Sequence, residues 1–87
     1  MPTVAILNGV LIVLFANDHP PPHFHARAAD FELRVQIDNG TIEVIRGAPR
    51  APFRRLLTDW TARNRAALLE NWHRLRRGEP TIWIPTP

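Results

Sequence analysis

The first half of the chain consists of short hydrophobic runs separated by turn residues. Residues 4–7 and 10–15 are apolar at nearly every position, and an Asn-Gly dipeptide stands between them. Asn-Gly supplies the positive φ angles of a type I′ turn, which is typical of a two-residue hairpin loop. The pattern therefore predicts a β-hairpin whose strands are buried on both faces or lie in an interface.

Residues 31–38 follow a different pattern, in which apolar and polar side chains alternate at a period of two. This alternation is typical of a strand with one buried face. A second Asn-Gly dipeptide turns the chain, and residues 41–45 are expected to return as the partner strand. Residues 23–27 are expected to form a further strand. Together these segments predict an antiparallel β-meander of about five short strands that includes two hairpins.

A helical period begins after the last of these strands. Pro52 suits the first turn of a helix. Residues 53–77 contain no proline or glycine, and Gly78 is a natural helix stop. The apolar residues fall on one arc at about 100° per residue; they are Phe53, Leu56, Leu57, Trp60, Ala67, Leu68 and Leu75. We predict one long C-terminal helix of roughly 26 residues, about 39 Å in length. Thr81–Ile84 is a candidate for a short final edge strand.

These elements predict an α+β fold in a single domain over residues 1–87, with the meander packed against the long helix. The chain has no cysteine, which excludes disulfides, thiolate zinc sites and a cysteine nucleophile. Its net charge of +3 is carried by arginine alone and is a weak indication of nucleic acid binding. The apolar N-terminal run is shorter than the about 20 residues that span a bilayer. We expect a cytoplasmic protein without a membrane segment.

Two asparagines interrupt the apolar arc of the predicted helix. Asn64 and Asn71 project onto its middle, and a buried amide without partners costs about 1–3 kcal/mol. They are expected to be structural polar residues that bond to sheet-edge backbone or to each other across a dimer seam. Alternatively, they line a pocket.

Three arginines of the same helix recur every eleven residues. Arg54, Arg65 and Arg76 stack on one line, three turns apart, and Trp72 falls beside them. An arginine stripe with an exposed tryptophan is a candidate surface for a partner protein or nucleic acid. The alternative is a solvated basic face with Trp72 tucked under a loop.

The segment NDHPPPHFHA, residues 17–26, is the richest in chemistry. Its three prolines predict an extended polyproline spacer. If His23 and His25 lie on a strand, both point to one face and can chelate one transition metal such as zinc, with Asp18 or His19 as a third ligand. Alternatively, His23, His25 and Asp18 form a metal-free catalytic acid/base site, or the segment is a structural corner that bonds to backbone.

Several of these features together resemble one family. They are the Asn-Gly-Val turn, the NDHPPPHFHA segment, the strand ending in IDNG and the helix segment LLENW. The chain resembles the bacterial domain of unknown function 4160 family over residues 2 to about 80. The positions that match the family pattern are Asp18, His19, Pro21, Pro22, His23, Phe24, His25, Trp60, Asn71 and Trp72.

The resemblance implies a small prokaryotic protein without an assigned activity. Members of the family look like partners of domain of unknown function 2442 proteins in toxin–antitoxin-like pairs. The chain departs from the pattern at Ala48, where a leucine is usual, and at Asn64, where a histidine is common. Because asparagine neither titrates nor ligates zinc well, this second departure argues against catalysis that uses the helix.

Two functions are therefore expected. The first is a binding module of a toxin–antitoxin-like pair, which contacts a domain of unknown function 2442 protein, a second copy of itself or nucleic acid. The second is a metal-dependent or histidine-based hydrolase or ribonuclease that uses His19, His23 and His25.

Overall fold

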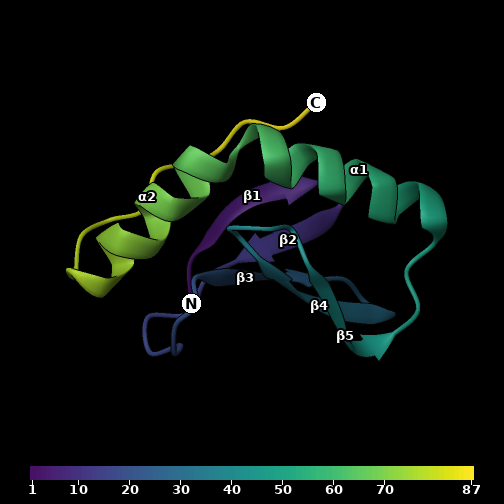
Figure 1. Ribbon diagram of the computed structural model, residues 1–87, viewed down its shortest axis with the longest axis horizontal. Helices are drawn as coiled ribbons and strands as arrows, with labels where there is room; N and C mark the ends of the chain where they lie inside the picture. The colour runs from purple at the N-terminus through teal and green to yellow at the C-terminus, as the bar shows by residue number, and fades with distance from the viewer.

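The computed structural model describes residues 1–87 as a five-stranded antiparallel sheet with two helices (Figure 1). The strands are β1 (Thr3–Leu7), β2 (Val10–Val13), β3 (His23–Arg27), β4 (Phe31–Gln36) and β5 (Ile42–Gly47). Their order in the sheet is β1-β2-β3-β4-β5, so each strand pairs with its neighbours along the chain. The α+β class and the five-stranded meander are confirmed.

The first hairpin turns at the predicted Asn-Gly dipeptide. Asn8 has a φ of 51° and Gly9 a φ of 81°, as a type I′ turn requires. The turn fixes the register of β1 against β2, in which Ile6 pairs with Leu11. Because side chains alternate along a strand, a shift of one residue in this register would turn the apolar side chains of one strand away from the core.

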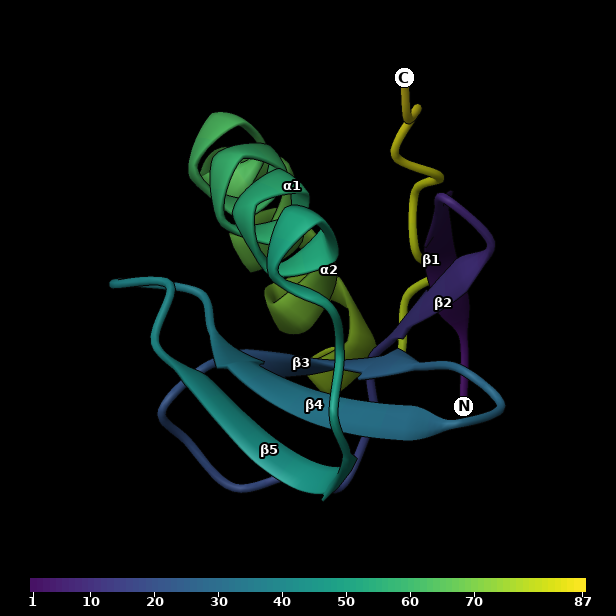
Figure 2. The same ribbon diagram turned by 90° about the vertical axis from the view of Figure 1, so that its right-hand side faces the viewer.

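The two faces of the sheet differ in polarity. On β3 and β4 the residues Phe24, Ala26, Leu33 and Val35 are at most 1% exposed and belong to the hydrophobic core. Their neighbours along the strands, including His23 and His25, point to the opposite face. Both helices lie on the core side of the sheet (Figure 2), where they contribute Leu57, Trp60, Leu68 and Trp72 to the core.

The prediction of one long helix is wrong. The chain forms α1 (Ala51–Arg63) and α2 (Arg65–Arg76), and Asn64 between them has φ −113° and ψ 19°. The side-chain Nδ2 of Asn64 donates to Trp60 O at 2.9 Å, the same carbonyl that its backbone N–H reaches. This side-chain bond competes with regular helical bonding. The two helices arch over the sheet (Figure 1), with a bend between them, and do not form one rod.

The C-terminal segment runs along β1 (Figure 2) without forming the short edge strand considered from the sequence. One bond joins it to the sheet, from Ile84 N to Val4 O at 2.8 Å. The backbone of Ile82 bonds to the Asn71 side chain and not to β1. The segment therefore covers the β1 edge without extending the ladder. None of the helices is both long and apolar enough to span a membrane.

Candidate metal centre

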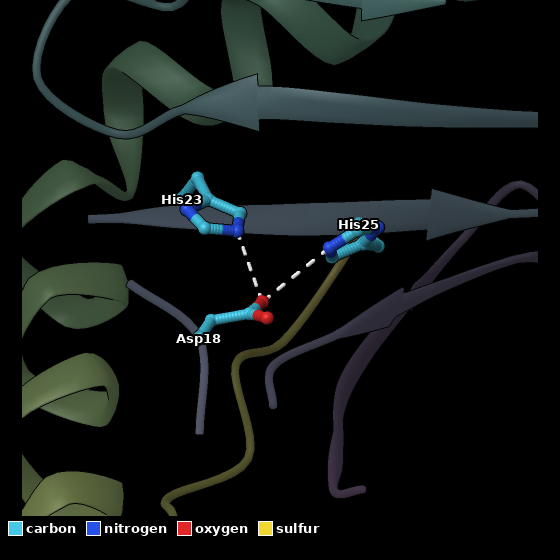
Figure 3. Close-up of side chains that lie close together, drawn as sticks. All are labelled: Asp18, His23 and His25. Atoms are coloured by element: carbon cyan, nitrogen blue, oxygen red, sulfur yellow. Dashed lines mark ion pairs between the residues drawn. The ribbon is translucent and has the colours of Figure 1, made fainter. Parts of the chain in front are cut away.

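Three side chains from the histidine segment converge beside β3. His23 and His25 lie two residues apart on this strand, so both rings project to the same face, opposite Phe24. Asp18 comes from the preceding loop and points at both rings (Figure 3). One ligand atom from each of the three residues lies within 4.8 Å of the others.

The outer nitrogens of both imidazoles face a single carboxylate oxygen. The distance from Asp18 Oδ2 is 2.9 Å to His23 Nε2 and 3.4 Å to His25 Nε2. The His23 and His25 side chains are only 8% and 14% exposed. Asp18 Oδ2 is also buried, and no donor reaches it with hydrogen-bond geometry, despite the short distance to His23.

The inner nitrogens of both rings are already committed to acceptors. His23 Nδ1 lies 3.0 Å from Pro21 O, and His25 Nδ1 lies 3.1 Å from Glu32 Oε2. A carbonyl and an ionised carboxylate can only accept, so the hydrogen-bond network assigns the proton to Nδ1 in each ring. In the neutral histidines both Nε2 atoms then carry lone pairs, and these face a third acceptor on Asp18.

This convergence of three acceptors requires a cation between them. One candidate is a proton, which would make one histidine an imidazolium paired with Asp18. The other is a metal ion. Ligand atoms around a tetrahedral zinc ion, with bonds of about 2.0–2.1 Å, lie roughly 3.3 Å apart. The two Asp18–histidine distances, 2.9 and 3.4 Å, are close to that spacing.

Residues around the cluster hold its ligands in place. The Trp72 ring lies 5.5 Å from the His23 ring, and the Phe15 ring lies 4.8 Å from the His25 ring. Arg76 Nη1 donates to Asp18 O at 2.7 Å and so ties the loop to α2. The Nδ1 bonds of the two rings are also typical of metal-ligating histidines, whose second ring nitrogen is usually bonded to a carboxylate or carbonyl.

A polar pocket opens beside the cluster. Its volume is about 300 Å³, and its lining side chains are polar except for two prolines. It is lined by Asp18, His19, Pro20, Pro21, His23, Arg34 and Gln36. Arg34 is the only arginine at the pocket, and its Nε donates to Glu43 at 2.8 Å. The pocket gives a small polar molecule a path to two of the three candidate ligands.

The structure does not bring His19 into the cluster. His19 is exposed and lines the pocket without facing Asp18, His23 and His25 as a ligand. The predicted polyproline rod is also not formed, because Pro20 and Pro21 lie in a bend with a cis peptide bond between them. The strand geometry of β3, and not a proline spacer, places the two imidazoles side by side.

The predicted arginine stripe does not exist as one exposed surface. Trp72 is 4% exposed and packs on His23, so it is not an exposed contact residue. Arg65 Nε donates to Ile37 O at 2.8 Å, and Arg76 bonds to the Asp18 loop with its guanidinium 5.1 Å from the Trp72 ring centroid. Of the three arginine side chains, only that of Arg54 has no hydrogen bond to backbone.

The two asparagines have different environments. Asn71 is 1% exposed, and its amide exchanges two 2.7 Å bonds with the backbone of Ile82. Asn64 is half-buried and caps the break between the helices. Asn71 therefore holds the C-terminal segment, whereas Asn64 shapes the helix pair.

Sequence reasoning did not identify Glu32 or Arg34 as parts of the site. Glu32 is on β4, and its carboxylate reaches His25 because β3 and β4 pair with His25 opposite Arg34. The alternating pattern places Glu32 on the polar face, and this was the only available signal. The register that brings it to His25 can be seen only in the folded sheet.

The fold and the cluster define a small α+β protein, an antiparallel meander with a His-His-Asp group on β3 and the preceding loop, in contact with α2. A sequence model described as a domain of unknown function, DUF4160, matches residues 9–73. The chain belongs to this family. The matched region includes the histidine segment and both asparagines. No curated protein and no solved structure matches the chain.

Proposed function

We propose that Asp18, His23 and His25 bind a divalent transition metal ion and that the protein is a metal-dependent hydrolase. The observation that carries this proposal is the orientation of the imidazoles. Both Nδ1 atoms are bound to acceptors, so both Nε2 lone pairs are directed toward a buried carboxylate oxygen that has no donor. A cation relieves the repulsion among these acceptors.

The donor set favours zinc or a similar ion. Two imidazole nitrogens and one carboxylate oxygen suit zinc, iron and manganese, whereas calcium and magnesium prefer oxygen ligands alone. Three protein ligands leave a tetrahedral position open, and this arrangement is typical of catalytic and not of structural zinc sites.

The polar pocket supports hydrolytic chemistry at that open position. A bound divalent ion lowers the pKa of a coordinated water and supplies a nucleophile near neutral pH. Arg34 lies on the pocket wall, where Glu43 accepts from its Nε and Nη2 and leaves Nη1 free to donate to an oxyanion, and the exposed imidazole of His19 lines the same pocket. A phosphate ester therefore matches the pocket better than an apolar substrate does.

Metal titration of protein purified without a histidine tag tests the proposal. Isothermal titration with zinc chloride is expected to give one site per chain, and His25→Asn and Asp18→Asn are expected to abolish it. His73→Gln is the matched control, because His73 is exposed on α2 and is not part of the cluster. If the wild-type protein binds no zinc, manganese or iron, or if His25→Asn binds as tightly as the wild type does, the proposal fails.

Hydrolysis is tested separately with bis-p-nitrophenyl phosphate and the metal-loaded protein. Release of nitrophenol that disappears in His25→Asn but persists in His73→Gln supports the hydrolase assignment. If the protein binds metal but does not hydrolyse this and related esters, the metal-site proposal stands and the hydrolase proposal fails.

We also propose that the protein is the partner-binding half of a toxin–antitoxin-like pair. The family resemblance supports this role, and so does the edge of the sheet at β5, which no other segment of the chain covers. The arginines expected to contact nucleic acid are mostly bonded to the protein's own backbone, which favours a protein partner. Co-purification with the product of a neighbouring gene tests this second function.

A further inference from the structure

The two edge strands of the sheet differ in whether another segment of the chain covers them. The β1 edge is covered by the C-terminal segment, which bonds to Val4 and buries Ile84 to 3% exposure. At β5, by contrast, five of the six residues are exposed, including Val44 at 45% and Ile45 at 49%. An apolar edge strand with free backbone groups is a template for pairing with another strand.

A groove separates β5 from α1. It has a volume of about 300 Å³ and is lined by Ile42, Arg54, Arg55, Thr58 and Asp59. Val44 pairs with the buried Leu33, so its side chain points to the helix side of the sheet, toward this groove. A strand added beside β5 would thus place alternate side chains in the groove, opposite α1.

The groove carries unpaired positive charge. Neither Arg54 nor Arg55 has a carboxylate oxygen within salt-bridge distance, although Asp59 contributes one carboxylate to the lining. On the other face of β5, Glu43 is paired with Arg34, and the Arg46 guanidinium is held by backbone carbonyls. The arginines that an added strand would meet without a side-chain bond to the rest of the chain are therefore Arg54 and Arg55, on the helix side.

We propose that the β5 edge binds an extended acidic segment of a partner protein by strand addition. Backbone hydrogen bonds to β5 supply affinity, and acidic side chains at alternate positions face Arg54 and Arg55 and supply specificity. A second copy of this chain is a poorer occupant, because its own β5 edge would bring the two copies' pairs of groove arginines close together. The proposal specifies the partner segment for the partner-binding function proposed above, and the surface is independent of the metal centre.

Two fluorescein-labelled nine-residue peptides test the proposal, one alternating valine with glutamate and the other valine with lysine. Fluorescence polarisation is expected to show binding of the glutamate peptide only. The double variant Arg54→Glu, Arg55→Glu is expected to lower its affinity at least about tenfold. Arg63→Glu, an exposed residue of the same helix outside the groove, is the matched control.

Amide hydrogen exchange locates the contact. Binding of the glutamate peptide is expected to slow exchange in Ile42–Gly47 and to leave β1 unchanged. Equal binding of the lysine peptide, protection elsewhere, displacement of the peptide by single-stranded RNA, or a protein that is already dimeric through β5 would each overturn the proposal. His25→Asn should bind the peptide normally, so that failure of the metal site and failure of this surface are distinguishable.

Discussion

Two polar sites are buried close together in this small protein, and they differ in how well their donors and acceptors match. Asn71 offers one donor and one acceptor, and Ile82 offers their complements at 2.7 Å each. One residue further along α2, Trp72 packs on His23, whose cluster directs two lone pairs and a carboxylate oxygen at one point. The first site is complete within the chain. The second requires a cation from outside or a proton.

This difference separates a structural polar group from a functional one on physical grounds. A buried amide with both bonds made stabilises the native state by fixing one arrangement of backbone. Converging acceptors without a donor cost free energy in the folded protein. Such a cost is typical of a site that is completed by a ligand. The comparison predicts that changes at Asn71 affect stability and that changes at the cluster affect binding.

The largest expected effect follows from removing the complete site. Asn71→Ala deletes two hydrogen bonds and leaves the backbone groups of Ile82 without partners, so it should lower the free energy of unfolding by about 2–3 kcal/mol. Urea denaturation followed by circular dichroism measures the change. Zinc affinity, measured under conditions where the variant is folded, should be unchanged.

Asn64→Ala is the matched control for this variant. It removes one bond from a half-buried side chain and gains the better helix propensity of alanine, so stability should change by less than about 1 kcal/mol. Equal losses for the two asparagine variants would contradict the distinction between them.

The second-largest expected effect is stabilisation by zinc bound to the cluster of Asp18, His23 and His25. Zinc present at about 100 times its dissociation constant should raise the free energy of unfolding by about 2.7 kcal/mol, because only the folded state aligns the three ligands. Thermal or urea unfolding with and without zinc measures this increment within each variant. The increment should vanish in His25→Asn and survive in Asn71→Ala, and the opposite result would reverse the assignment of the two sites.

A third, smaller effect concerns the residue that orients His25. Glu32→Gln keeps the shape of the side chain but exchanges a carboxylate for a weaker acceptor, so zinc affinity should fall about 10–100-fold. Isothermal titration measures it, and Glu43→Gln, a neighbouring glutamate outside the cluster, is the control. An unchanged affinity in Glu32→Gln would show that Glu32 does not position the ring.

The sequence predicted those parts of the molecule that depend on local pattern. The first Asn-Gly turn, the period-two strand and the glycine stop at the helix end each follow from the conformational preferences of one or two residues. The second Asn-Gly dipeptide lies in a longer loop, residues 37–41, in which Asn39 has no positive φ. The helix break at Asn64 was missed because its cause is a side-chain bond to Trp60 O that competes with the helical pattern. Residue spacing alone does not show whether this side-chain bond will interrupt a helix.

The candidate site was predictable only in part for a similar reason. The i, i+2 spacing of His23 and His25 was enough to place both rings on one face of a strand. Which third residue joins them depends on the path of the proline bend, which brings Asp18 in and leaves His19 outside. The contacts of Glu32 and Trp72 depend on strand register and helix packing, and these involve residues far apart in the chain.

The smallest expected effect concerns a polar pair that is neither buried nor part of a site. Arg77 donates two hydrogen bonds to Glu79 beyond the end of α2, which hold the pKa of that carboxyl below its usual value of 4.5. A carboxyl with a lowered pKa stabilises the folded state above about pH 4.5, and this contribution is lost as the pH falls through the lower folded value. Because both side chains are exposed, solvent screens the pair and the contribution is small. Glu79→Gln should therefore shift the urea midpoint slightly downward near pH 7 and leave no difference from the wild type at about pH 2. A shift of equal size at both pH values would mean that the residue acts through packing and not through its charge.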